Sequence, residues 1–194
     1  MGRKKLSGKI ALVTGSSRGI GRGIAERLSQ DGASVVINYV SNSDKAEEVV
    51  AAIKSGGGTA VTVQADVCRI DGIHQLFEKT LEHFGRLDIL VNNAGIRISQ
   101  TVADLQEEEF DRLFAINVKG PFFVCQQAVH RISDGGRIIN ISSAVTQMML
   151  SGYSIYAASK AAIDQLTRVL AKEMGGRNIT VNAVAPGPVD TELF

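Results

Sequence analysis

A tyrosine and a lysine lie four residues apart at Tyr156 and Lys160, and Ser143 precedes the tyrosine by thirteen residues. If this segment is helical, the phenol and the ammonium share a face, because positions i and i+4 are neighbours. A free tyrosine has a pKa near ~10, and a nearby cation lowers that pKa. Proton transfer is efficient when the pKa lies near the working pH. The pair is therefore predicted to act as a general acid and base, with Ser143 donating to a substrate oxygen.

The alternative is that this spacing carries no chemistry, because Tyr-x-x-x-Lys occurs by chance on many helices. Two neighbouring side chains also compete for the roles. Ser142 stands beside Ser143, and adjacent residues of a strand face opposite sides of the sheet. Tyr153 precedes Tyr156 by three residues, but only Tyr156 has a lysine four residues later.

Short runs rich in β-branched and apolar residues alternate with helical patterns along the chain. We expect strands at Lys9–Thr14, Ser34–Tyr39, Thr59–Ala65, Leu87–Asn92, Gly136–Ser142 and Asn178–Ala185. Several consist almost wholly of Val, Ile, Leu and Ala, as strands covered on both faces do. The alternation predicts an α/β fold with one doubly wound parallel sheet and helices on both faces. Ligands of such sheets bind beyond the carboxyl ends of the strands.

Amphipathic helices are expected between these strands. The spacing of one buried helix face is clearest in Ile73, Leu76, Phe77, Leu81 and Phe84. A longer helical pattern begins at Phe110 and continues to about Arg131. Another carries Tyr156, so the candidate acid is expected on a helix.

Composition and charge exclude several classes of protein. The chain has 194 residues, which suits one domain (residues 1–194) with its own core, and 44% of them are hydrophobic. The net charge of +1 gives no field that would attract nucleic acid. No apolar run is long enough for a signal sequence or a membrane span. We therefore expect a protein that binds neither nucleic acid nor membranes.

The cysteines and histidines predict a reduced, metal-free protein. Cys68 and Cys125 are far apart in apolar surroundings, so two buried thiols are expected rather than a disulfide. His74, His83 and His130 show no metal-ligand spacing and are interpreted as surface or helix-packing residues. A cytoplasmic location follows from the reduced thiols.

A glycine-rich segment, Thr14–Gly21, follows the first expected strand and opens the first helix. Its pattern G-x-x-x-G-x-G is a variant of the dinucleotide-binding fingerprint. Glycines there allow a tight turn and let backbone N–H groups approach a pyrophosphate at a helix N-terminus. The alternative is a turn that only packs closely. The predicted cofactor contacts in this loop are Gly15, Ser17, Arg18, Gly19, Ile20 and Gly21.

The end of the second expected strand predicts which cofactor binds. An acidic residue there would bond the ribose of NAD, but this chain has no carboxylate between Asn38 and Ser43. Arg18 can pair with a 2′-phosphate, and the contacts assigned here are Asn38, Tyr39 and Ser41. We therefore expect NADPH rather than NADH, and expect Asn38→Asp to reverse that preference. Ser43 also has an ordinary interpretation, as the N-cap of a helix that begins near residue 44.

Several further segments appear in a characteristic order. They are Asp66-Val67, Asn92–Gly95, Asn117 and Pro186-Gly187, which accompany Thr14–Gly21, Ser143 and Tyr156–Lys160. Together they cover almost the whole chain. In this set and order the sequence resembles the classical branch of the short-chain dehydrogenase/reductase family. The resemblance implies a Rossmann-type domain that binds NAD(P) and transfers a hydride to or from a carbonyl.

The resemblance also implies a role for each matching residue at the reaction centre. Ser143 would orient and polarise the carbonyl, and Tyr156 would deliver the proton. Lys160 would bind the nicotinamide ribose and lower the pKa of Tyr156. Asn117 would kink its helix and hold a water in a proton relay.

Other matching residues would hold the cofactor. Asp66 would hydrogen-bond the adenine ring, with the backbone of Val67 beside it. The segment Asn93, Ala94 and Gly95 would shape the adenosine side of the groove, and Asn92 would stabilise the central strand. The residues implied beside the nicotinamide carboxamide are Pro186, Gly187, Val189 and Thr191.

The resemblance indicates the type of reaction more clearly than the identity of the substrate. The closest pattern is that of 3-oxoacyl-[acyl-carrier-protein] reductases and related NADPH-dependent carbonyl reductases. Arg177 matches a basic residue that reads the carrier protein in that group, whereas Asp134 stands where a second basic residue is usual. Met148, Met149 and Leu150 suggest an adaptable apolar wall for a small-molecule carbonyl substrate, or ordinary loop packing.

The chain ends at Phe194, whereas family members continue through the substrate loop, a further helix and a seventh strand. We therefore expect a sequence truncated at its C-terminal end, the alternative being a shortened protein. The family commonly forms homo-oligomers, so a dimer or tetramer is expected. A different class of function stays open, namely a nucleotide-binding regulatory or scaffold protein without turnover.

Overall fold

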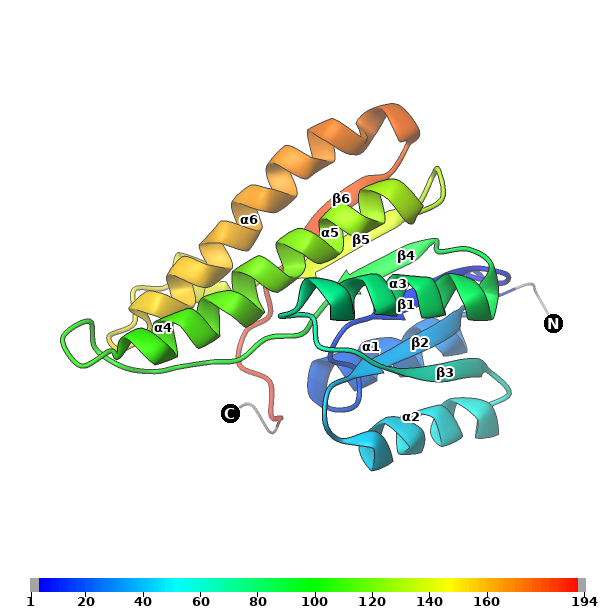
Figure 1. Cartoon of the computed structure of the whole chain (residues 1–194), viewed down its shortest axis with the longest axis horizontal. Coiled ribbons are helices and arrows are strands. Elements are labelled where there is room, and N and C mark those ends of the chain that lie inside the picture. The colour runs from blue at the N-terminus through cyan, green and yellow to red at the C-terminus, as the bar shows by residue number, and fades with distance from the viewer. Residues whose placement is uncertain (1–3, 192–194) are drawn as a thin grey trace.

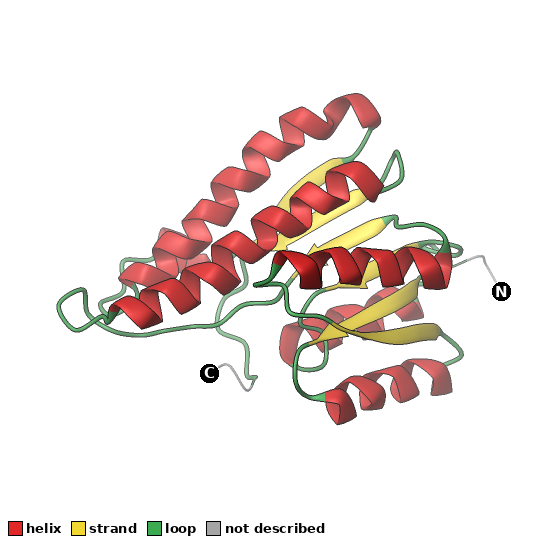
Figure 2. Cartoon of the chain, viewed as in Figure 1, coloured by secondary structure: helices red, strands yellow, loops and turns green. Residues whose placement is uncertain are grey.

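The structure is a computed structural model that describes residues 4–191. Six parallel strands form a sheet whose order across its width is β3-β2-β1-β4-β5-β6 (Figure 2). Their bounds are β1 Ile10–Val13, β2 Ser34–Tyr39, β3 Thr59–Gln64, β4 Ile89–Asn92, β5 Arg137–Ile141 and β6 Thr180–Val184. Each lies within two residues of the strand expected from the sequence. The prediction of a doubly wound parallel sheet is confirmed.

Helices cover both faces of the sheet (Figure 1). α1 and α2 pack on one face, whereas α3, α5 and α6 pack on the other. The helix bounds are α1 Gly19–Gln30, α2 Ser43–Ser55, α3 Ile70–Phe84, α4 Glu107–Phe114, α5 Gly120–Arg131 and α6 Ser154–Met174. Three shorter segments are η1 Ala115–Lys119, η2 Ala144–Gln147 and η3 Gly175–Arg177.

Alternate side chains of the strands enter two separate cores. Leu12 of β1 is fully buried in the core that contains Phe77 of α3, whereas its neighbours Ala11 and Val13 are buried on the opposite face with Val49 of α2. Because both faces are covered, the strands are apolar throughout rather than alternating with polar residues. Each large buried side chain contributes about 1.5–3 kcal/mol, so the sheet is a firm platform for the loops at its edge.

The carboxyl ends of β1 and β4 meet at the point where the strand order divides. On one side of this pair the sheet extends from β1 to β2, and on the other side it extends from β4 to β5. Thr14 ties the two ends together. Its backbone N–H donates to the carbonyl of Val91 at 3.0 Å, and its Oγ1 accepts from the N–H groups of Asn93 and Ala94 at 3.0 and 3.1 Å. A crevice is expected at such a switch point.

The glycine-rich loop between β1 and α1 needs glycine at two positions. Gly15 has a φ of +59°, and a Cβ there would lie 2.9 Å from the Cα of Ala94. A Cβ on Gly21 would lie 2.5 Å from Asn93 Nδ2 and 2.6 Å from the carbonyl oxygen of Gly15. Residues with side chains would force the loop away from the segment after β4, so these glycines set the width of the crevice.

The helix expected from Phe110 to about Arg131 is present, and it contains a turn of a different type in its middle. α4 and α5 are joined through η1, a π-helical turn that contains Asn117. Asn117 is buried, and its side chain bonds the backbone of Ile96, accepting from the N–H at 2.9 Å and donating to the carbonyl at 2.8 Å. π-turns inside helices are frequent at functional sites. The predicted kink at Asn117 therefore takes the form of one widened turn.

One predicted helix cap is wrong. Ser43 is the first residue of α2 rather than its N-cap, and the cap is Asn42, whose side chain accepts from the N–H of Lys45 at 3.1 Å. Asn and Ser are both favoured N-caps, so the local sequence did not distinguish them.

Candidate active site

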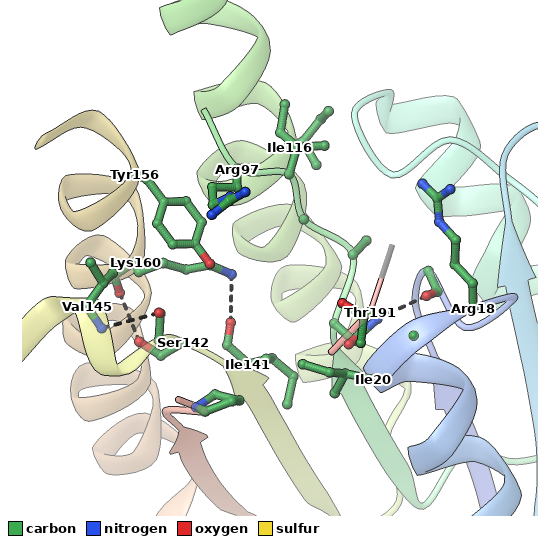
Figure 3. A pocket seen from close by; sticks show the side chains of 18 of the residues that line it. Arg18, Ile20, Arg97, Ile116, Ile141, Ser142, Val145, Tyr156, Lys160 and Thr191 are labelled. Atoms are coloured by element: carbon green, nitrogen blue, oxygen red, sulfur yellow. Dashed lines mark hydrogen bonds between the residues drawn. The ribbon is translucent and has the colours of Figure 1, made fainter. Parts of the chain in front are cut away.

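A cleft of about 630 Å³ runs along the carboxyl ends of the strands. Its size is that of a small-molecule site. Figure 3 shows Tyr156, Lys160 and Arg97 on one side of the cleft, and Arg18, Ile20 and Thr191 on the other. The side that contains Tyr156 also has an apolar wall, formed by Ile96, Val145, Met148 and Leu150.

Tyr156 and Lys160 lie in the first turns of α6 and are 9% and 5% exposed. The Nζ of Lys160 lies 5.9 Å from the centre of the Tyr156 ring and donates to the carbonyl of Ile141 at 2.9 Å. The helical spacing therefore places phenol and ammonium on one face, as predicted. The last residue of β5 fixes the ammonium beside the ring.

The electrostatics of the pair differ from the prediction. Burial raises the pKa of Tyr156, while a hydrogen bond from Ser143 and the positive charge of Arg97 act to lower it. Burial also lowers the pKa of Lys160 to about 8. The expectation that Lys160 lowers the pKa of Tyr156 is therefore corrected. Desolvation is the larger effect here, and the cation acting on the phenol is Arg97.

The two neighbouring serines have different partners, as their positions at the end of a strand predict. Ser143 lies close enough to Tyr156 to lower the pKa of its phenol, and the Oγ of Ser143 accepts from the N–H of Val145 at 3.3 Å. Ser142 is buried, and its Oγ donates to the backbone carbonyl of Lys160 at 3.4 Å. Only Ser143 is therefore placed to act together with the phenol of Tyr156.

The other part of the cleft collects most of the residues predicted to hold a dinucleotide. The glycine loop, the ends of β2, β3 and β4, and the segment after β6 all contribute. The predicted residues that line it are Gly15, Ser17, Arg18, Gly19, Ile20, Tyr39, Ser41, Asp66, Val67, Asn93, Ala94, Gly95, Pro186, Gly187 and Thr191. Backbone at the start of α1, glycines without Cβ atoms and a nearby arginine suit an anionic cofactor.

A comparison with known families identifies this combination of fold and cleft. A family model described as short chain dehydrogenase matches residues 9–194. The chain belongs to the short-chain dehydrogenase family. It is therefore an oxidoreductase of the kind that interconverts CH–OH and C=O groups.

Relatives of this dehydrogenase span a wide range of sources. A versicolorin reductase of Emericella nidulans is 47% identical over 191 residues, covering 98% of this chain and 72% of that protein. A short-chain dehydrogenase of Burkholderia cenocepacia, solved in complex with NADP, superimposes with a TM-score of 0.94 at 43% identity, over 97% of this chain and 78% of that one. The landomycin C-6 ketoreductase LanV, solved with NADP and rabelomycin, gives a TM-score of 0.89 at 44% identity, over 93% and 76%.

Asn38 does not line the cleft of the dehydrogenase, contrary to the prediction. It is 1% exposed, and its side chain accepts from the N–H of Gly15 at 3.1 Å and donates to the carbonyl of Ala65 at 3.0 Å. Asn38 thereby ties the glycine loop to the backbone just after β3. The residues of this segment that reach the cleft are Tyr39, Val40, Ser41 and Asn42.

Three more predicted residues also lie outside the cleft lining. Gly21 is packed behind the glycine loop, and Asn117 is packed behind Ile96 and Ser159, to whose Oγ it donates at 3.2 Å. Val189 borders a separate groove over α1. Gly21 and Asn117 support the walls of the cleft rather than form them.

The sequence did not lead us to Arg97, and it led us to consider Tyr153 only as an alternative to Tyr156 for the role of proton donor. Both line the cleft, and Arg97 Nη1 donates to Tyr153 Oη at 2.9 Å. A charged residue two positions after the Asn93-Ala94-Gly95 segment that follows β4 was the available signal. It was overlooked because its partner lies 56 residues further along the chain.

Arg177 is engaged within the fold. Its Nε donates to Asp134 at 2.7 Å, and its Nη2 donates to the carbonyl of Ile132 at 2.6 Å. Nη1 donates to the carbonyl of Val129 near the end of α5. The guanidinium therefore satisfies carbonyls at a helix C-terminus, which is an ordinary structural role.

Three expectations about the rest of the chain can be compared with the described residues. Cys125 is buried as expected, whereas Cys68 is only partly so, and burial raises the pKa of each thiol to about 12. Within residues 4–191, no helix is long and apolar enough to span a membrane. The same residues contain no cluster of three or more His, Cys, Asp or Glu side chains arranged to hold a metal.

Proposed function

We propose that this dehydrogenase reduces the carbonyl group of a ketone or aldehyde with NADPH, and oxidises the alcohol in the reverse direction. The observation that carries the proposal is the placement of Tyr156. Its ring centre lies 5.9 Å from the Nζ of Lys160, and Ser143 acts on its pKa, in a cleft that the glycine loop also lines. A proton donor and a dinucleotide cradle in one cleft are what carbonyl reduction requires.

The chain's own residues divide the reaction between them. The Ser143 hydroxyl donates a hydrogen bond to the substrate oxygen and polarises the carbonyl. A dihydronicotinamide bound in the cleft would provide the hydride that the carbonyl carbon accepts. Tyr156 then gives its phenolic proton to the developing alkoxide, and the raised pKa keeps that proton in place until it is needed. The positive charge of Arg97 stabilises the phenolate that results, and Lys160 would hold the ribose of the bound cofactor.

Asn117 is proposed to support the supply of protons to this site. Its side chain is occupied by the backbone of Ile96 and by Ser159. A role in a water relay would therefore fall to the backbone of the widened turn η1, whose hydrogen bonding departs from that of an α-helix. The side chain would position that backbone.

The preference for NADPH is proposed from the end of β2. The residues that reach the cleft there, Tyr39–Asn42, include no carboxylate that would repel a 2′-phosphate, and Arg18 lines the same part. Two of the solved relatives named above contain NADP, which agrees with this choice.

The proposed substrate is a small carbonyl compound with a sizeable apolar part. Met148 and Leu150 lie on the wall next to Tyr156, and methionine adapts to varied shapes. The named relatives include a versicolorin reductase and a ketoreductase bound to rabelomycin, so polycyclic aromatic ketones come first. A 3-oxoacyl thioester is the second choice, because the carrier-reading role expected of Arg177 competes with its bonds inside the fold.

The proposal extends to the whole molecule. We regard the chain as one NAD(P)-binding domain of a cytoplasmic homo-oligomer, either a dimer or a tetramer. Phe110 and Phe122 are 43% and 49% exposed on the long α4–α5 rod, and an apolar helix surface of this kind suits a subunit interface.

Oxidation of NADPH by the full-length protein tests this function. A panel of polycyclic aromatic ketones, acetoacetyl thioesters, diketones and aldehydes should include at least one compound that is reduced. Binding of NADPH without turnover of any compound would instead favour the nucleotide-binding regulatory or scaffold protein.

A further inference from the structure

The substrate side of the cleft contains a second cation besides Lys160, namely Arg97, which is held in place by the fold. Arg97 follows β4, lines the cleft and is partly buried. Its Nη1 donates to Tyr153 Oη at 2.9 Å, and its guanidinium carbon lies 5.9 Å from the centre of the Tyr153 ring. The side chain is thereby held to the start of α6 rather than extended into solvent.

This cation lies close to the reacting phenol. The rings of Tyr153 and Tyr156 are 6.4 Å apart between centres, at an angle of 69°. Figure 3 shows the guanidinium of Arg97 beside the Tyr156 ring. A substrate whose carbonyl is at Tyr156 would therefore place atoms a few bonds away next to Arg97.

Charge in the cleft is distributed unevenly. Among the described residues that line it, Asp66 is the one acidic side chain, and it is bonded to the N–H of Cys68 near the adenosine end. Near the reaction centre, the charged residues of the described cleft lining are Arg97 and Lys160, both cationic, while Asp164 of α6 acts on Lys160 from outside that lining. Apolar neighbours such as Ile96 and Val145 strengthen the field of these charges, because they exclude water.

We infer that Arg97 and Tyr153 together recognise an acidic oxygen of the substrate, a carboxylate or an ionised phenol, beside the carbonyl that is reduced. The inference rests on the proposed function. A guanidinium presents a planar fork of donors that matches such oxygens. Tyr153 accepts from Arg97 through its oxygen, so its own O–H can point to the same anion. The pair would select acidic carbonyl compounds over their neutral analogues.

Matched substrates separate recognition of charge from general activity. The full-length protein would be assayed with 4-acetylbenzoate and its methyl ester, and with 4-hydroxy-3-nitroacetophenone and its methyl ether. The first pair tests a carboxylate, and the second tests a phenol that is ionised at neutral pH. The quantity compared is the ratio of kcat/KM for the anion to kcat/KM for its neutral partner.

Arg97→Met should lower that ratio roughly ten- to a hundredfold in at least one of the two substrate pairs. The change should appear mainly in KM, because the contact between Arg97 and the substrate anion exists in both the ground state and the transition state. Arg97→Lys should recover part of it, and Tyr153→Phe should lower it by less. Arg112→Met removes an exposed arginine of α4 outside the cleft lining and serves as the control with an unchanged ratio.

Calorimetric binding of the corresponding alcohol, 4-(1-hydroxyethyl)benzoate, in the presence of NADP⁺ gives a second measurement. Its affinity should fall by a similar factor in Arg97→Met, even if the carbonyl compounds are poor substrates. A ratio and an affinity that are the same in the parent and in Arg97→Met would overturn the inference while leaving the proposed function intact. Absence of NADPH oxidation with every carbonyl compound would count against the proposed function, and the binding measurement would still decide the inference.

Discussion

The two parts of the cleft are built in different ways. The cofactor part consists largely of backbone, namely the glycine loop after β1 and the segment after β4, tied together through Thr14. The substrate part consists of side chains brought from separate elements, such as Arg97 after β4 and Tyr153 and Tyr156 on α6. At Gly15 and Gly21 the first part has no room for an added Cβ. The second can change its residues, and hence its substrates, without disturbing the loop that binds the cofactor.

The largest effect expected in the substrate part is that of Ser143→Ala. Loss of the hydrogen bond to the substrate oxygen should lower kcat by roughly a hundred- to a thousandfold. Ser142→Ala, one residue earlier, removes only a bond to the backbone of Lys160 and should lower kcat by less than roughly fivefold. Steady-state kinetics of both variants measure the difference. Equal losses would mean that both hydroxyls act only by supporting the loop.

The cofactor part is probed most sharply by Gly21→Ala. The new Cβ would meet Asn93 and the backbone of Gly15 at less than 3 Å, so the loop must move and NADPH should bind roughly ten- to a hundredfold more weakly. Gly23→Ala is the matched control on the same helix, because a Cβ there has nothing within 4 Å. It should leave the Kd for NADPH unchanged and stabilise α1 by up to about 1 kcal/mol. If both variants bind NADPH like the parent, the loop is not the cradle.

Two aspartate substitutions at the end of β2 distinguish a buried residue from a cleft residue. Asn38→Asp would place an acceptor against the carbonyls of Val63 and Ala65, so it should lower the free energy of unfolding by about 1–3 kcal/mol. It should not convert the enzyme to NADH, contrary to the expectation from sequence. Ser41→Asp, which is exposed and lines the cleft, should weaken NADPH roughly tenfold relative to NADH. Cofactor titrations and urea denaturation of both variants test this, and a switch of cofactor in Asn38→Asp alone would refute it.

The smallest effect concerns the pH dependence of stability. Lys160 has its pKa lowered to about 8 in the fold, from about 10.5 when unfolded. Below pH 8 both states hold the proton, and the fold bears the full cost of a buried ammonium. Between about pH 8 and 10.5 the unfolded chain binds more protons, so stability rises with pH. The free energy of unfolding of the parent, relative to Lys160→Met, should therefore increase across that window in chemical denaturation. A flat difference would contradict the lowered pKa.

Most of the fold could be predicted from the sequence, because covered parallel strands and amphipathic helices leave clear periodic patterns. The widened turn at Asn117 could not, since one extra residue per turn hardly changes the apolar spacing between Phe110 and Arg131. The glycine loop was also predictable, because the residues that form it are contiguous in the sequence, as those of a strand are.

The side-chain part of the site was predictable only where a residue acts within its own helix, as Tyr156 and Lys160 do. Asn38 was misplaced because its partners are on β3 and the glycine loop, so its inward direction is set by tertiary contacts. Arg97 was missed because its partner is on a distant helix. Sequence pattern thus predicts the reaction better than the substrate, which is selected by such contacts.

The central claim is that Tyr156 supplies the proton while the rest of the cleft holds the cofactor. The most direct test is single-turnover reduction of a carbonyl substrate from the panel by Tyr156→Phe that is saturated with NADPH. The Kd for NADPH is measured on the same sample. The account predicts a Kd within about twofold of the parent and a hydride-transfer rate lowered roughly a hundredfold or more. A rate close to that of the parent, or a loss explained entirely by weaker NADPH binding, would contradict it.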